Sequence, residues 1–133
     1  MNAKEAESRV IKYTFLKTKI IYYNKKIQLI NNELRSITST SFEEIKNRDT
    51  NDKKEKLIDK KIMLEKEIKN MELESKFIEE AISVLDKRDK EIIIDFYVHK
   101  LSINVIAQKQ RYSSVRIRQL KQIALEKLGK YLD

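Results

Sequence analysis

The sequence predicts an all-α protein, and three observations support that prediction. First, the 133 residues include no proline and a single glycine, so the usual breakers of helices are nearly absent. Second, charged residues make up 38% and apolar residues 41% of the chain, which suits narrow apolar seams between solvated faces. Third, two long stretches repeat apolar residues at heptad spacing. We therefore expect a long antiparallel helical hairpin, similar to a coiled coil, followed by a domain of shorter helices.

The first predicted helix runs from about residue 4 to residue 37. Its apolar residues follow one another at alternating spacings of three and four: Tyr13, Leu16, Ile20, Tyr23, Ile27, Ile30, Leu34 and Ile37. This spacing keeps one apolar stripe on one side of the helix. Such a helix is unstable alone, so another helix must cover the stripe.

A second seam supplies the covering helix within the same chain. Residues 38–51 are rich in Ser, Thr, Asn and Asp, which favour turns, and Ser41 with Glu44 matches a capping box. From Asp52 to about Val84 a second helix is predicted. Its seam consists of Leu57, Leu64, Ile68, Met71, Ile78, Ile82 and Leu85, with Lys61 and Ser75 interrupting it. Two seams of similar length joined by a short polar loop predict an antiparallel hairpin.

The first helix has a wider apolar stripe than a seam between two helices requires. The additional apolar residues are Ile11, Phe15, Ile21, Tyr22 and Leu29. A second copy of the chain would cover them, so the excess favours a homodimer through the hairpin. A monomeric hairpin stays open as the alternative.

Residues 85–133 predict a separate domain of short helices, which divides the chain into 1–84 and 85–133. Asp86 or Asp89 is the expected N-cap of its first helix, and residues 100–101 are the expected link to the next. Ser102 is expected to cap a helix that ends at Gln110, and Ser113 to cap the last helix, which runs towards residue 131.

In a long stretch of this domain every charged residue is basic. The net charge of the chain is +8, and no Asp or Glu occurs between Phe96 and Leu125. The basic residues in that interval are Lys100, Lys109, Arg111, Arg116, Arg118 and Lys121. A helix pair with a basic face predicts a polyanionic partner, and double-stranded DNA is the first candidate.

Residues 85–128 resemble region 4 of bacterial sigma factors and the related helix-turn-helix of LuxR-type regulators. The marks are Leu85-x-x-Arg88-Asp89-x-x-Ile92-Ile93, then Phe96, Leu101-Ser102-x-x-x-Ile106-Ala107, and Ser113-x-x-x-Ile117-Arg118-Gln119-Leu120-x-x-x-Ala124-Leu125-x-Lys127-Leu128. In size and layout the chain is similar to the ArpU-type and RinA-type late-operon regulators of Gram-positive phages. The resemblance implies sequence-specific DNA binding that activates transcription, with RNA polymerase as a further partner.

The sequence departs from the sigma pattern at three points. Arg111 stands at the turn position where the family often has glycine with a positive φ. Ser114 and Val115 follow the cap, where sigma factors often have a charged pair. No counterpart of the region that melts and reads the −10 element is present. We therefore do not expect a full sigma factor, nor recognition of a standard −35 element.

In a helix-turn-helix, the N-terminal part of the second helix enters the major groove. Arg118 and Gln119 are the predicted base contacts, because arginine pairs with guanine and glutamine with adenine through two hydrogen bonds. The predicted phosphate contacts are Lys109, Arg111, Arg116 and Lys121. Ser113 and the helix N-terminus are expected to hold a phosphate, and Ser114 and Gln122 to face the groove. Ile106, Ile117, Leu120 and Ala124 are expected between the two helices.

The remaining residues do not indicate an enzyme. The chain has no cysteine and one histidine, so neither a metal site nor another cofactor is predicted. No apolar run approaches the ~20 residues of a membrane span, no export signal is recognisable, and a cytoplasmic protein is expected. The alternative function is a helical interaction or adaptor protein that binds RNA polymerase, or another protein, without sequence-specific recognition of DNA.

Overall fold

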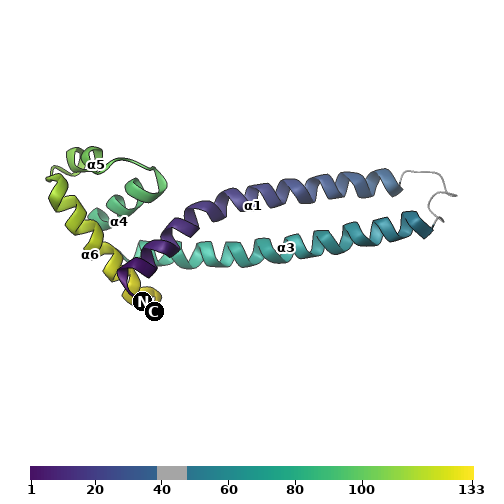
Figure 1. Cartoon of the computed structure of the whole chain (residues 1–133), viewed down its shortest axis with the longest axis horizontal. Coiled ribbons are helices and arrows are strands. Elements are labelled where there is room, and N and C mark those ends of the chain that lie inside the picture. The colour runs from purple at the N-terminus through teal and green to yellow at the C-terminus, as the bar shows by residue number, and fades with distance from the viewer. Residues whose placement is uncertain (39–47) are drawn as a thin grey trace. The chain divides into compact units, whose positions relative to one another are not determined.

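The computed structural model describes residues 1–38 and 48–133, and every element within these ranges is helical (Figure 1). The elements are α1 (Ala3–Thr38), α3 (Arg48–Ser83), α4 (Lys87–Ile93), the π-helix η1 (Ile94–Val98), α5 (Ile103–Gln110) and α6 (Ser114–Leu132). The all-α prediction is confirmed, with a helical hairpin of α1 and α3 followed by short helices. The predicted capping box of Ser41 and Glu44 lies outside the described residues.

The chain divides into two compact units. One unit, here called the terminal unit, comprises Met1–Leu16 and Glu74–Asp133, and the other, the hairpin unit, comprises Lys17–Leu73. The domain boundary predicted at residues 84/85 falls between α3 and α4. The first turns of α1 and the last turns of α3 belong to the same compact unit as α4, η1, α5 and α6.

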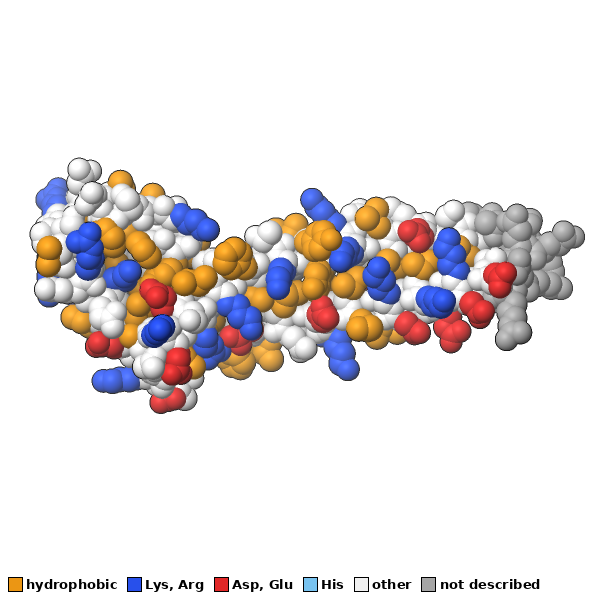
Figure 2. Space-filling view, viewed as in Figure 1, with side chains coloured by type: hydrophobic (Ala, Val, Ile, Leu, Met, Phe, Trp, Pro, Cys, Tyr) orange, Lys and Arg blue, Asp and Glu red, His pale blue; other side chains and the backbone are white. Residues whose placement is uncertain are grey.

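The hairpin unit packs along the two predicted seams. Every apolar seam residue in this unit is buried or half-buried, and the most buried are Ile30, Leu64 and Ile68. The additional apolar residues Tyr22 and Leu29 remain exposed, as does Ile21. Figure 2 shows apolar side chains along the hairpin with basic and acidic side chains between and beside them. The heptad spacing thus determines which side of each helix faces the other.

The core of the terminal unit draws on all of its long elements. Its largest cluster combines residues from α1, α3, α4, η1 and α6: Ala6, Val10, Tyr13, Ile78, Ala81, Ile82, Ile93, Tyr97, Ala124, Leu125 and Leu128. The single glycine, Gly129, is buried in α6, where a β-carbon would collide with the carbonyl oxygen of Met1. The close approach of the N-terminal backbone therefore requires glycine at this position.

Two aspartates are buried beside the core of the terminal unit. Asp86 occupies the N-cap position of α4 without a side-chain capping bond, whereas Asp89 lies inside the helix and is fully buried. The alternative that Asp89 caps α4 is therefore wrong. Lys127 Nζ donates to Asp89 Oδ2 at 3.0 Å, which balances the buried charge. Asp95, in η1, is the second buried carboxylate.

Candidate nucleic-acid interface

Local sequence signals position the two helices of the helix-turn-helix. Ser102 Oγ accepts a hydrogen bond from Val105 N at 3.2 Å at the start of α5, and Ser113 Oγ accepts one from Arg116 N at 3.1 Å at the start of α6. Both predicted N-caps are confirmed. Each cap satisfies a backbone donor that the first turn of a helix leaves unpaired.

Arg111 makes the turn between α5 and α6 without glycine. It adopts the left-handed conformation, with φ 61° and ψ 42°, at the C-cap of α5. Tyr112 N donates to Ala107 O at 3.0 Å across this turn, the arrangement that closes helices ending in a left-handed residue. The side chain of Arg111 is exposed. Arg111 thus stands where the sigma pattern often has glycine, and the turn still has its left-handed conformation.

A second apolar cluster fixes the angle between α5 and α6. It consists of Ile92 from α4, Ile106 and Ala107 from α5, and Ile117 and Leu120 from α6. Ile106, Ile117 and Leu120 were predicted between the helices, and their burial there is confirmed. Ala124, predicted in the same place, is fully buried but packs in the other cluster, with residues of α1 and α3. One turn separates Leu120 from Ala124, and by that turn α6 has passed beyond α5.

The solvent face of α6 gathers four of the nine predicted DNA contacts. Arg116, Arg118, Gln119 and Gln122 are exposed and, with Ile123, line one shallow depression. Arg116 donates from a guanidinium nitrogen to Gln119 Oε1 at 3.2 Å, which orients the glutamine amide. The two predicted base contacts therefore lie beside each other on one open helix face.

Three further predicted site residues use their side chains within the domain. Ser114 Oγ donates to Asn104 Oδ1 at 2.7 Å and links the start of α6 to α5. Lys109 Nζ donates to Asp95 Oδ2 at 2.8 Å, and Lys121 Nζ lies 4.0 Å from the centroid of the Phe96 ring. Both lysines thus contact η1, and in the absence of DNA their ammonium groups already have partners within the protein.

Asp95 receives hydrogen bonds from two sides. His99 Nδ1 lies 3.0 Å from Asp95 Oδ1, opposite the contact with Lys109. Burial by itself raises the pKa of the Asp95 carboxyl, but the hydrogen bonds from Lys109 and His99, together with their coulombic attraction, outweigh it and lower the pKa below its usual value. The Asp95 hydrogen bond, followed by the coulombic attraction, raises the pKa of Lys109. This cluster joins η1 to α5.

Two exposed residues of the interface were not predicted as contacts. Val115, in the first turn of α6, is 61% exposed, and Ile123 is 38% exposed. Val115, Gln119 and Gln122 follow one another at spacings of four and three, so they share one face of α6. That spacing is visible in the sequence and places Val115 on the same side of α6 as the predicted contact Gln119.

Neither a metal centre nor a membrane span is found in the described part of the chain. No group of three or more His, Cys, Asp or Glu side chains there is placed to hold a metal ion. No described helix combines the length and apolar character needed to cross a bilayer.

Comparison with known families agrees with this geometry. Residues 81–130 match the model of the family described as Sigma-70, region 4. The match begins in the last turn of α3 and covers α4, η1 and α5 with nearly all of α6. No curated protein and no solved structure matches the chain. Residues 81–130 thus form a sigma-70 region 4-like helix-turn-helix, a match that suggests DNA binding in transcription.

Proposed function

We propose that this protein is a sequence-specific regulator of transcription that reads double-stranded DNA with α6. One observation carries the proposal: the open face of a sigma region 4-like second helix presents Arg118, Gln119 and Gln122 together. In such motifs the N-terminal half of the second helix lies in the major groove. The absence of acidic residues from 97 to 124 removes the charge repulsion that would oppose this docking.

Arg118 and Gln119 are the proposed base readers. Arg118 donates to guanine O6 and N7, and Gln119 pairs with adenine N6 and N7. The hydrogen bond from Arg116 to Gln119 Oε1 supports this assignment, because it restricts the amide before DNA binds and so lowers the entropy cost of reading a base. Gln122, one turn further along, extends the contact surface.

Phosphate contacts hold the protein on the duplex. Arg111 at the exposed turn and Arg116 are the principal proposed contacts, and the capped N-terminus of α6 at Ser113 offers backbone N–H groups to a phosphate. Lys109 and Lys121 contribute less, because their ammonium groups already contact Asp95 and Phe96. Ser114 contributes through its backbone, since its hydroxyl is bonded to Asn104.

The hairpin provides the second half of the proposed function. We propose a cytoplasmic, phage-type sigma-like activator of a late operon, in which the α1–α3 hairpin mediates dimerisation or contacts RNA polymerase. The exposed apolar residues Ile21, Tyr22 and Leu29 support a homodimer, because a second hairpin would remove them from water. Sedimentation of the wild type and of Tyr22→Ser/Leu29→Ser checks this: a concentration-dependent dimer that the variant loses supports it, and a monomeric wild type contradicts it.

The test of DNA reading uses duplexes selected from a random library by the full-length protein. The best duplex and a scrambled one are then titrated at several salt concentrations. Wild type is expected to prefer the selected duplex by ~10³-fold or more, and Arg118→Ala/Gln119→Ala to lose that preference, each base contact contributing ~1–3 kcal/mol. Lys130→Ala, an exposed charge near the end of α6, is the matched control and keeps the preference.

The alternative function predicts a different result. An adaptor that binds RNA polymerase without reading DNA would bind both duplexes equally, weakly and with steep salt dependence. It would also retain polymerase binding in the Arg118→Ala/Gln119→Ala variant. That pair of results would contradict the regulator proposal and favour the adaptor.

A further inference from the structure

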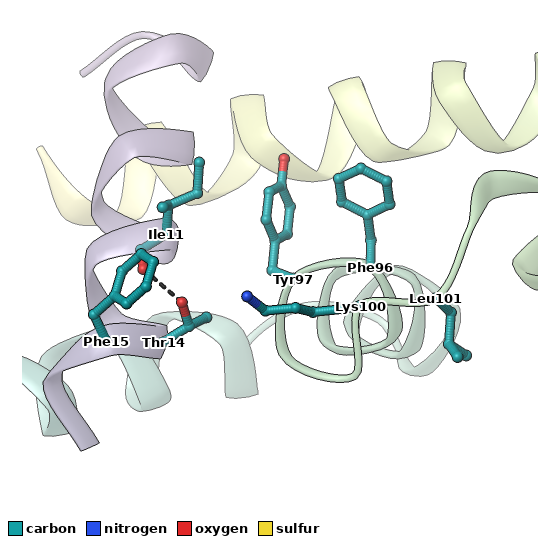
Figure 3. Close-up of a pocket in the computed structure, with 7 residues that line it drawn as sticks. All are labelled: Ile11, Thr14, Phe15, Phe96, Tyr97, Lys100 and Leu101. Atoms are coloured by element: carbon teal, nitrogen blue, oxygen red, sulfur yellow. Dashed lines mark hydrogen bonds between the residues drawn. The ribbon is translucent and has the colours of Figure 1, made fainter. Parts of the chain in front are cut away.

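A pocket of about 350 Å³ lies in the terminal unit, away from the open face of α6 (Figure 3). Its walls come from the first part of α1, from η1 and from the link after η1. The lining residues are Ile11, Thr14, Phe15, Phe96, Tyr97, Lys100 and Leu101. Three of them precede the segment that matches the sigma family. The pocket therefore exists only because the start of α1 packs beside η1.

The walls of the pocket are apolar, and much of their surface faces solvent. Phe15 is 56% exposed and Ile11 is 42% exposed. The hydroxyl groups nearby are already used, since Thr14 Oγ1 donates to Ile11 O at 2.6 Å and the Tyr97 hydroxyl donates to Glu7. Large exposed apolar side chains around a concavity are typical of interaction sites. The pocket offers carbon contacts rather than hydrogen bonds.

Lys100 is the single charged residue among those that line the pocket. It adopts the left-handed conformation with φ 57°, which is uncommon for a residue with a side chain. Its Nζ lies 5.6 Å from the centroid of the Phe15 ring, and Figure 3 shows the ammonium group directed toward the α1 wall. Among the described residues no carboxylate forms an ion pair with Lys100. Its charge is thus available to a partner.

We propose that this pocket docks a segment of another protein in which a bulky apolar side chain stands beside an Asp or Glu. The apolar side chain enters between Phe15 and Phe96, and the carboxylate pairs with Lys100. The volume suits one or two side chains, and the open rim suits a protruding chain segment better than an enclosed small molecule. The net charge of +8 also favours an acidic partner. This site is separate from DNA reading and does not depend on it.

The test is a selection from a displayed random-peptide library on the full-length protein. Enrichment of peptides with Phe, Leu, Ile or Trp beside Asp or Glu is expected. The most enriched peptide, labelled with fluorescein, is then titrated by anisotropy. Phe15→Ser is expected to weaken its binding at least tenfold, as for a residue at the centre of an interface. Lys100→Glu is expected to weaken it about threefold to fivefold and to select basic peptides instead.

Phe77→Ser is the matched control, because Phe77 is 49% exposed in the same unit but does not line the pocket. It is expected to bind the peptide as the wild type does. Circular dichroism and the urea midpoint check that each variant is folded. The proposal is overturned if no peptide class is enriched. It is also overturned if folded Phe15→Ser binds the peptide normally, or if Phe77→Ser weakens binding as much as Phe15→Ser does.

Discussion

The hairpin unit and the terminal unit share the same two long helices but differ in how completely they exclude water. In the hairpin unit the most buried apolar residues, Ile30, Leu64 and Ile68, keep 6–8% of their surface exposed. In the terminal unit Val10, Ile78 and many others keep 0–2%. Both regions have the same heptad spacing, so the spacing does not account for the difference.

The difference follows from the number of elements around each seam. Two helices meet along one line, so a seam residue keeps a flank that faces solvent. In the terminal unit α4, η1 and α6 cover those flanks, and residues from all of these elements join α1 and α3 in one cluster. Complete burial contributes more free energy than partial burial, because each additional Å² of apolar surface removed from water contributes about 25 cal/mol.

A matched pair of leucine truncations is expected to show the largest difference between the two units. Leu128→Ala, at a residue 1% exposed, is expected to lower the free energy of unfolding of the terminal unit by ~2–5 kcal/mol. Leu64→Ala, at a residue 8% exposed, is expected to cost less than about 2 kcal/mol, because solvent fills the space. Urea unfolding combined with amide hydrogen exchange measures each unit. Equal losses of unfolding free energy in the two variants would contradict the proposed difference between the units.

A buried serine in the seam of α3 provides the next test. Ser75 is 7% exposed, and its hydroxyl has no hydrogen-bond partner among the described residues. Ser75→Ala is expected to raise the free energy of unfolding by about 1 kcal/mol, because it removes an unsatisfied polar group. Ser83→Ala is the control, since Ser83 is exposed and donates to Glu80 O; it is expected to stay within about 0.5 kcal/mol. The urea midpoints of the two variants measure these changes in stability. A Ser75→Ala variant that is less stable than the wild type would contradict the prediction.

The buried carboxylate of Asp95 predicts an acid transition that belongs to the terminal unit alone. Because its pKa is lowered in the folded state, Asp95 stabilises the fold above the ordinary carboxyl pKa, and that stability is lost as the pH falls through the lowered value. Lys109→Gln removes one of the donors that lower the pKa, so unfolding is expected at a higher pH. Circular dichroism during acid titration measures the midpoint.

Lys61→Gln is the control for the acid transition. Lys61 contacts Glu65 in the hairpin unit at 4.0 Å, and Glu65 is half-exposed, so water screens the pair. Its loss is expected to leave the acid midpoint unchanged. A shift as large as that of Lys109→Gln would mean that the buried cluster has no special role.

The smallest expected effects concern the salt dependence of DNA binding. Arg116→Ala is expected to reduce the slope of log affinity against log salt by about 1, as for one lost phosphate contact. Lys121→Gln is expected to reduce it by less, because Lys121 already contacts Phe96. Lys25→Gln, an exposed lysine of the hairpin unit, is expected to leave the slope unchanged. A reduced slope in Lys25→Gln would reveal a second DNA-binding surface.

Short-range sequence patterns predicted more of the candidate site than of the core. The caps at Ser102 and Ser113 and the turn at Arg111 each depend on a few neighbouring residues, and all three were predicted at the correct positions. The contacts of Lys109 and Lys121 were missed, because Asp95 and Phe96 lie 14 and 25 positions earlier in the sequence. No local pattern relates side chains at such separations.

The helical class, the two seams, the caps and the basic face of α6 follow from the order of residues alone, because helix periodicity and capping act within a few turns. Packing between distant segments decided which seam residues are fully buried, why Gly129 is glycine, and how Asp89 and Asp95 are paired. It also decided that Ile11 and Phe15 border a pocket with Lys100. These features require α1 to meet η1, α4 to meet α6, η1 to meet α5, and the N-terminal backbone to meet α6. Contacts between segments distant in the chain form only when the whole unit folds.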